Sequence, residues 1–183
     1  MTMADNAASG YERTEDKTDY IEIVMDSGNS IVIRLRPDKA PLTVANFQKL
    51  VSENFYDGLI FHRIISGFMI QGGDPDGTGM GGSKDAIKGE FRQNGVDNDL
   101  PHKRGAVSMA RTNDPNSASS QFFICHASSS FLDGLYAAFG AVVAGMEEVD
   151  RIAALRTGFQ DRPVEPPVMT RVRFVRPVAG EGE

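Results

Sequence analysis

Residues 20–25 and 30–36 constrain the fold more than any other part of the chain, because they have the pattern of two paired strands. Apolar side chains in the second run recur at every other position, which is the period of a β-strand. They are Ile31, Ile33 and Leu35. The DSGN sequence between the two runs is typical of a turn. Together these features predict the start of an antiparallel meander.

The rest of the chain continues as short apolar runs and adds two segments with helical spacing. Further strands are expected in residues 60–71, with a break at Ser66-Gly67, and in 105–110, 121–126, 138–143 and 168–174. Helices are expected at residues 41–53 and 146–155. In the second helix acidic residues come early and arginines late, the order that the helix dipole favours. Many short strands with two separate helices favour a β-barrel or sandwich with helical lids.

The length and charge of the chain limit the classes of function. One domain is expected for 183 residues. The net charge is −6 and the sequence contains no basic run, which argues against nucleic-acid binding. No apolar run has the length of a membrane span, and the N-terminal residues lack a secretory signal pattern. We therefore expect a cytoplasmic protein that does not associate with membranes.

Two terminal segments fall outside the expected domain. Residues 1–18 are polar and acidic without a periodic apolar pattern, so we expect them to be disordered. Residues 178–183 are expected to form a flexible tail, which leaves residues 19–177 as the domain. Cys125 is the only cysteine in the sequence, so no internal disulfide is expected. Its apolar neighbours predict a small buried side chain.

Residues 61–74, FHRIISGFMIQGGD, combine large apolar side chains with a single arginine, Arg63. Two later segments have a matching character, SQFFICH at residues 120–126 and FLDG at residues 131–134. One cation, several apolar side chains and a few amides predict an apolar cleft with one polar anchor. No activated nucleophile, carboxylate pair or metal cage is evident, so the site should bind and polarise its substrate without a metal or cofactor.

These segments resemble the cyclophilins, the cyclosporin-binding class of peptidyl-prolyl cis–trans isomerases. The shared motifs occur in the same order and are FHRII, GFM, QGGD, SMA, SQFFI, FLDG and FG. The resemblance extends over about residues 19–176 and is strongest to the bacterial-type, single-domain members. It implies an all-β-dominated fold, a closed eight-stranded antiparallel barrel capped by two α-helices. It also implies isomerisation of X–Pro peptide bonds.

The resemblance implies roles for particular residues. The catalytic residues it implies are Arg63, Phe68, Gln71 and Phe123. The substrate-binding residues it implies are Met69, Ala110, Arg111, Gln121, Phe131, Leu132, Tyr136 and His62. Phe68, Met69, Phe123 and Leu132 would line a proline pocket. Ala110 and Arg111 would lie on the strand edge that the substrate backbone follows, and Gln71 and Gln121 would form an amide pair. His62 is expected to face away from Arg63, because neighbouring side chains on a strand point to opposite faces.

Arg63 has two alternative roles on composition alone. An arginine on a strand can pair with a carboxylate, or its rigid guanidinium can donate hydrogen bonds to a reacting group. The FHRII-GFM-QGGD context favours catalysis. When an X–Pro amide twists, the prolyl nitrogen regains a lone pair, and we expect Arg63 to donate to it. Gln71 is expected to hydrogen-bond the substrate backbone or to hold Arg63.

Three residues differ from the pattern common in eukaryotic members. Phe131 occupies the position of a tryptophan whose indole donates a hydrogen bond to cyclosporin, so we expect weaker binding of the drug and unchanged isomerase activity. Tyr136 occupies the position of a histidine, so no imidazole is available there. Ser66 replaces a proline before the Gly67-Phe68 turn, and we expect a local change in that loop only.

Other motifs are weaker. The glycines at 77, 79 and 82 match a dinucleotide fingerprint, but no βαβ unit surrounds them and turn-building is the better interpretation. Asp74-x-Asp76 partly imitates a calcium loop but lacks the final glutamate and helical flanks. The three histidines have no metal-ligand spacing. Cys125 and His126, as neighbours on a strand, would face opposite ways and could not form a dyad.

Three classes of function are compatible with this fold. The first is an isomerase that assists protein folding, and the second is a module that binds proline-containing segments without turnover. The third is a chaperone-like surface, which would need a large exposed apolar patch. Arg63 favours the isomerase, because a pure binder needs the pocket but not the arginine. The expected partners are proline-containing peptides and unfolded or native proteins, and the expected state is a monomer.

Overall fold

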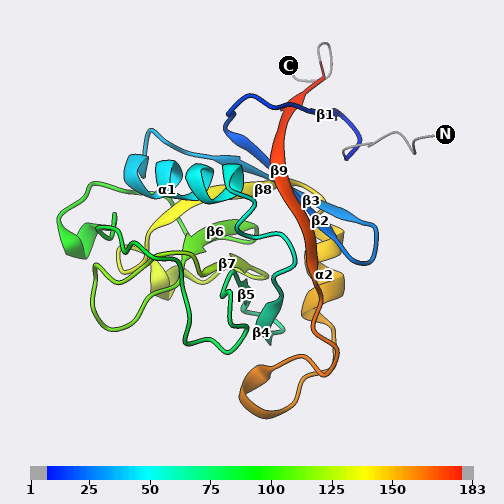
Figure 1. Cartoon of the computed structure of the whole chain (residues 1–183). Coiled ribbons are helices and arrows are strands. Elements are labelled where there is room, and N and C mark those ends of the chain that lie inside the picture. The colour runs from blue at the N-terminus through cyan, green and yellow to red at the C-terminus, as the bar shows by residue number, and fades with distance from the viewer. Residues whose placement is uncertain (1–7, 179–183) are drawn as a thin grey trace.

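A computed structural model describes residues 8–178, which contain nine strands and two α-helices. The strands are β1 Tyr11–Arg13, β2 Tyr20–Met25, β3 Ser30–Leu35, β4 Phe61–Ile65, β5 Met69–Gly72, β6 Ala106–Met109, β7 Phe122–Cys125, β8 Ala138–Ala144 and β9 Met169–Pro177. The helices are α1 Pro41–Ser52 and α2 Met146–Ala153. Short 3-10 turns lie at Arg92–Asn94, Ser130–Leu132 and Phe159–Asp161. All neighbouring strands are antiparallel, in the order β1-β9-β2-β3-β8-β6-β7-β5-β4 (Figure 1).

The sheet curls into a barrel whose last gap is closed by a short bridge. Ile60, just before β4, pairs with Val168, just before β9. On either side, the Phe61 amide donates to the Pro167 carbonyl at 3.1 Å and the Gly58 amide donates to the Met169 carbonyl at 2.7 Å. The barrel-like, β-dominated fold is therefore confirmed. It differs from the expected closed eight-stranded ladder in having nine strands and a seam without continuous pairing.

The additional strand, β1, lies where disorder was expected. Tyr11 pairs with Pro177, and Arg13 pairs with Val175 on the outer edge of β9. The Glu12 carboxylate also accepts a hydrogen bond from Arg176 at 2.7 Å. The expectation of disorder across residues 1–18 is therefore wrong for the described part, because backbone pairing to β9 orders a segment with no apolar period. Residues 1–7 and 179–183 lie outside the described residues.

Both helices lie where their apolar spacing predicted them. Pro41 begins α1, where its missing N–H costs nothing, and Val44, Phe47 and Val51 are buried in the core. The Phe47 ring packs edge-on against Phe122 at 5.5 Å between centroids. On α2, Val149 and Ile152 are fully buried. The two helices cover different sides of the barrel (Figure 1).

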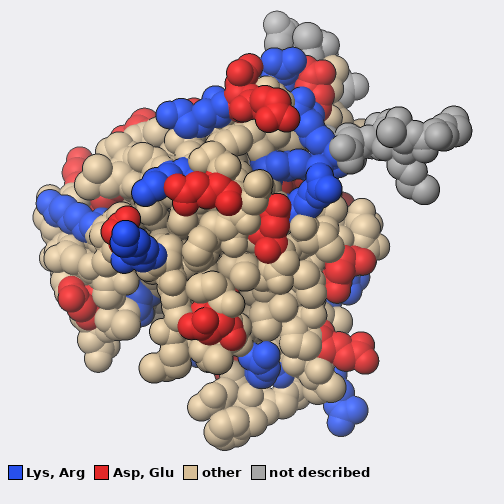
Figure 2. All heavy atoms as spheres, viewed as in Figure 1, with Lys and Arg blue, Asp and Glu red and all other residues tan. Residues whose placement is uncertain are grey.

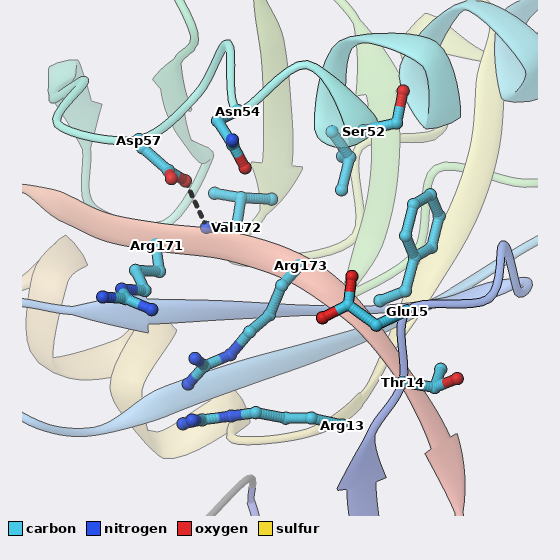
Figure 3. Close-up of a pocket in the computed structure, with 11 residues that line it drawn as sticks. Arg13, Thr14, Glu15, Ser52, Asn54, Asp57, Arg171, Val172 and Arg173 are labelled. Atoms are coloured by element: carbon cyan, nitrogen blue, oxygen red, sulfur yellow. Dashed lines mark hydrogen bonds between the residues drawn. The ribbon is translucent and has the colours of Figure 1, made fainter. Parts of the chain in front are cut away.

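The seam beside β9 contains a cavity of about 400 Å³. Figure 3 shows the Asp57 carboxylate reaching the Val172 amide, at 2.9 Å, where a neighbouring strand would otherwise pair. Arg173 donates from Nε to the fully buried Glu22 at 2.9 Å. On this face of the molecule basic and acidic side chains are interspersed (Figure 2). None of the predicted site residues lines this cavity.

Candidate active site

Three adjacent strands place the main predicted residues in a row. In the register of the sheet, Arg63 on β4 lies opposite Gln71 on β5, and Gln71 lies opposite Phe123 on β7. Side chains that are opposite each other on neighbouring strands lie close together. A cation, an amide and an aromatic ring, far apart in the sequence, therefore meet on one part of the barrel.

A cavity of about 150 Å³ opens at this row of residues. All the predicted catalytic residues line it, together with most of the predicted substrate-binding residues. Its lining is Arg63, Phe68, Met69, Gln71, Ala110, Arg111, Phe123, Leu132 and Tyr136. Met69, Phe123 and Leu132 belong to a small buried apolar cluster separate from the main core. The cavity thus has an apolar floor and a polar rim, the character that its residue types predict.

Arg63 has no ion-pair or hydrogen-bond partner among residues 8–178 of the structure. Its side chain is exposed at the mouth of the cavity. The alternative interpretation required Arg63 to pair with a carboxylate, and no such ion pair occurs among the described residues. Gln71 does not hold Arg63 either, because its Nε2 donates to Gln121 Oε1 at 3.0 Å.

Arg111 has a different environment from Arg63. Its guanidinium lies 4.8 Å from the ring centre of Phe91 and 4.7 Å from that of Tyr136. Its Nη2 also donates to the Leu135 carbonyl at 2.7 Å. These contacts fix Arg111 in the wall of the cavity and leave Arg63 as the unpaired cation at its rim.

Three predicted residues lie beside the cavity instead of lining it. Gln121 lines an adjoining cavity of about 370 Å³ under the glycine-rich loop. Phe131 is 66% exposed, and its ring centre lies 5.5 Å from that of Phe68. His62 is buried and lines a third cavity, of about 320 Å³, which also touches Arg63. The register shifts between Phe61 and Arg63, so strict alternation of side chains does not hold at His62.

The glycine-rich loop is held in place by the buried carboxylate of Asp74. This carboxylate accepts hydrogen bonds from the amides of Asp76 at 2.8 Å and Gly79 at 2.6 Å, and from those of Thr78 and Gly81 at 3.1 Å. Burial raises the pKa of Asp74, but these hydrogen bonds outweigh it and lower the pKa. The Asp74 segment therefore organises a loop. Among the described residues no group of three or more His, Cys, Asp or Glu side chains could hold a metal ion.

The same loop positions the amide pair. Gln121 donates from Nε2 to the carbonyls of Gly79 at 3.0 Å and Gly81 at 2.7 Å. Because Gln121 also accepts the hydrogen bond from Gln71, the loop fixes both amides. The predicted amide pair is thus a continuous chain of hydrogen bonds from the loop to the rim of the cavity.

A buried polar network behind Phe123 was not predicted from the sequence. The His102 ring stacks on Phe123, with centroids 6.1 Å apart. Its Nδ1 lies 2.9 Å from Asp133 Oδ1, and its Nε2 lies 2.8 Å from Ser108 Oγ. Burial lowers the pKa of His102, although Asp133 opposes this effect. Ser108 is fully buried, so this Ser–His–Asp set cannot attack a substrate and instead supports the pocket wall.

No motif could have revealed this network. His102, Ser108 and Asp133 are brought together by the loop before β6, by β6 itself and by the Ser130–Leu132 turn. The only sequence signal was Asp133 within the FLDG segment. The sequence alone does not show that Asp133 bonds to His102, because only the fold brings these two residues together.

The barrel and its pocket define a class of proteins with an unpaired cation at the rim of a small apolar cavity. Comparison with known proteins agrees with this class. The family described as "Cyclophilin type peptidyl-prolyl cis-trans isomerase/CLD" matches residues 20–174. The chain belongs to the cyclophilin family and is a peptidyl-prolyl cis–trans isomerase.

Individual relatives support this assignment over most of their length. The chain is 47% identical to peptidyl-prolyl cis-trans isomerase ppi1 of Schizosaccharomyces pombe over 137 residues, 74% of this chain and 86% of the relative. It is 47% identical to peptidyl-prolyl cis-trans isomerase B of Bacillus subtilis over 131 residues, 72% of this chain and 87% of the relative.

A solved structure shares the fold. The crystal structure of a cyclophilin-type isomerase from Cryptosporidium parvum, determined in the presence of the dipeptide Ala-Pro, superimposes with a TM-score of 0.77 at 30% identity. The match covers 84% of this chain and 97% of that chain. Separately, no helix among residues 8–178 is long and apolar enough to cross a membrane.

Proposed function

We propose that this isomerase holds the proline ring of its substrate in the cavity at Phe68, Met69 and Phe123, while Arg63 assists rotation of the preceding peptide bond. Rotation about a peptide bond costs about 18–20 kcal/mol because twisting breaks amide resonance. For X–Pro bonds uncatalysed exchange takes tens to hundreds of seconds. The enzyme needs to break no covalent bond; it must favour the twisted amide.

Arg63 would act at the prolyl nitrogen. In the twisted state this nitrogen has a lone pair that the planar amide lacks, so a guanidinium donor binds the transition state more strongly than the ground state. One hydrogen bond to a charged group contributes about 1.5–3 kcal/mol. That corresponds to roughly ten- to a hundred-fold in rate. The remaining acceleration would come from fixed substrate geometry in a water-poor pocket.

The observation that carries the proposal is the unpaired state of Arg63 at the rim of an apolar cavity. An arginine already bound to a carboxylate would have to give up that partner before it could donate to a substrate. Arg63 has no such partner among the described residues. Gln71, held by Gln121, lies opposite it and would bind the substrate backbone.

Proline-containing peptides are the substrate class that these features support. The related structure from Cryptosporidium parvum was determined in the presence of Ala-Pro. We extend this class to unfolded and native proteins, so that the enzyme would assist folding. A monomeric state, a cytoplasmic location and weak cyclosporin binding remain predictions.

Exchange NMR on a capped Ala-Pro peptide tests the role of Arg63. Wild type should accelerate cis–trans exchange, and Arg63→Ala should lose about ten- to a hundred-fold of that rate while it binds the peptide with similar affinity. Arg171→Ala, at the remote seam, removes the same charge and should leave the rate unchanged.

Two outcomes would contradict the proposal. If Arg63→Ala retained the wild-type rate, acceleration would come from the pocket alone. If wild type bound the peptide without accelerating exchange, the chain would be a proline-binding module in spite of its family.

A further inference from the structure

We propose that His126 is a positioning residue for this isomerase, and that its neutral ring fixes the turn that presents Phe68 to the proline pocket. The inference goes beyond the role of Arg63 and rests on the proposed function, in which Phe68 contacts the proline ring of the substrate. No sequence motif pointed to it, because His126 lies after β7 and its partners lie on the β4–β5 turn and on α2.

His126 holds the β4–β5 turn through two hydrogen bonds. The Gly67 amide donates to His126 Nδ1 at 2.8 Å. The His126 amide donates to the Phe68 carbonyl, also at 2.8 Å. Within the turn, the Phe68 amide donates to the Ile65 carbonyl at 3.0 Å. Ser66 and Gly67 are exposed, so packing stabilises this turn little. The hydrogen bonds with His126 therefore hold it in place.

These contacts determine the tautomer of the His126 ring. A backbone amide can only donate, so Nδ1 must carry a lone pair and the ring proton must be on Nε2. That nitrogen lies 3.1 Å from Asp150 Oδ1 on α2. His126 therefore accepts from the turn and donates to the helix.

Asp150 is itself fixed by Arg104. Two guanidinium nitrogens of Arg104 donate to the two carboxylate oxygens of Asp150, each at 2.7 Å. The Arg104 Nη1 also donates to the His126 carbonyl at 2.9 Å. Hydrogen bonds from Arg104 lower the pKa of Asp150, which keeps this carboxylate an acceptor. The three residues thus form a bonded set that connects α2 to the substrate pocket.

A second proton on the ring would break the contact with the turn. It would have to enter at Nδ1, where the Gly67 N–H already points, and two donors would then face each other. Two charged groups bond to His126 from the elements packed against it. Asp150 on α2 faces the ring at Nε2, and Arg104 in the loop before β6 donates to the backbone carbonyl. A proton at Nδ1 would therefore release the turn.

The expected kinetic effect is on substrate binding. In the proposed function Phe68 would pack against the proline ring in the ground state and the transition state alike, so its displacement would remove uniform binding. Such a loss raises KM and leaves kcat unchanged. Loss of Arg63 is predicted to do the reverse, lowering kcat with KM nearly unchanged. Steady-state kinetics can therefore separate the two roles.

Two substitutions of His126 separate positioning from simple packing. In His126→Asn the side-chain Oδ1 occupies the place of Nδ1 and accepts from Gly67, but it cannot be protonated in this pH range. His126→Ala offers no acceptor at any pH. The probe is a capped Ala-Pro peptide without titratable groups, studied between about pH 8 and about pH 5, the range in which histidines gain a proton.

For wild type, KM should rise several-fold on acidification while kcat changes little. His126→Asn should have the wild-type KM at high pH and no acid rise. His126→Ala should have a raised KM throughout. The Gly67 amide resonance should shift with pH in wild type and stay constant in His126→Asn.

The inference would be overturned by either of two results. An acid rise in KM that persists in His126→Asn would assign the effect to His62 or His102, which are also near the pocket. An unchanged KM in His126→Ala would show that the turn needs no support. If His126→Ala fails to fold, the pH profile of His126→Asn and its Gly67 resonance still decide the question.

Discussion

Phe131 lies beside the cavity that Arg63 lines and does not line it. It is 66% exposed and contacts the ring of Phe68. The family resemblance places here a tryptophan that donates a hydrogen bond to cyclosporin, which a phenylalanine cannot do. We therefore expect a substitution at Phe131 to change cyclosporin binding without altering the residues that line the cavity.

Phe131→Trp should bind cyclosporin more tightly than wild type. One neutral hydrogen bond contributes about 0.5–1.5 kcal/mol, which corresponds to roughly two- to ten-fold in affinity. Calorimetric titration measures this change, and peptide exchange NMR should give the same isomerase rate for both proteins. An unchanged affinity for the drug would mean that the indole at this position has no acceptor within reach.

Single residues also show what sequence patterns could predict. Cys125 is fully buried, as its apolar neighbours indicated. Motif context predicted Arg63 and Phe123 as site residues, and both line the same cavity, because their strands are determined by local sequence. By contrast, the environments of Asp74 and His102 depend on partners from loops, so no local pattern predicted them.

At the scale of elements, α2 is attached to the barrel through Glu148. This buried carboxylate accepts hydrogen bonds from Ser27 Oγ at 2.8 Å and from Asn29 Nδ2 at 2.9 Å, both in the β2–β3 turn. Arg151 also donates to it at 3.0 Å. Burial raises the pKa of Glu148, but these hydrogen bonds outweigh burial and lower it.

Glu148→Gln should reduce the free energy of unfolding by about 1–3 kcal/mol at neutral pH, the usual effect of weakening a buried charged hydrogen bond. Because the pKa of Glu148 is lower in the folded state, its charge stabilises the protein above the pKa of an unfolded glutamate, about 4.3. That stability is lost as pH falls through the lower folded-state pKa. The difference between the two proteins should therefore shrink below about pH 4.

Urea unfolding at several pH values measures this difference. Glu147→Gln on the same helix is the matched control, because Glu147 is exposed and makes no such hydrogen bonds among the described residues. It should have little effect at any pH. If Glu148→Gln destabilised the protein equally at every pH, the negative charge of Glu148 would not be what attaches α2 to the barrel.

The helices and most strands could be predicted from the sequence because their signals are local. The apolar spacing of α1 and the alternation in β3 are both contained within a few residues. β1 could not be predicted, because the YER segment has no apolar period and is ordered only by β9 at the other end of the chain. The bulge at Phe61–Arg63 could not be predicted from the sequence either, because it depends on the register between β4 and β5.

At the scale of the whole molecule, β9 has two partners on its outer edge. Residues 58–61 pair with its beginning, and β1 pairs with its end. An uncovered strand edge is a template for pairing with another chain. β1 therefore covers the part of the β9 edge that residues 58–61 do not reach, and we expect it to protect that edge.

Deletion of residues 1–14 should leave the isomerase rate unchanged, because β1 contributes nothing to the cavity that Arg63 lines. It should lower the urea midpoint and promote self-association through the bared edge of β9. Analytical ultracentrifugation measures the association, with full-length protein at the same concentration as control. A fully monomeric truncated protein of unchanged stability would show that β1 has no protective role.

The position of β9 between β1, β2 and the seam has a consequence for how the molecule forms. β2 and β9 are nearly the whole described chain apart, and their pairing joins Ile21 to Phe174. Contacts between such distant segments slow folding, because a long loop must close before they can form. During synthesis β9 leaves the ribosome after every other described strand. The barrel can therefore close only after β9 has been synthesised, and this isomerase is itself completed by a long-range pairing of its own chain.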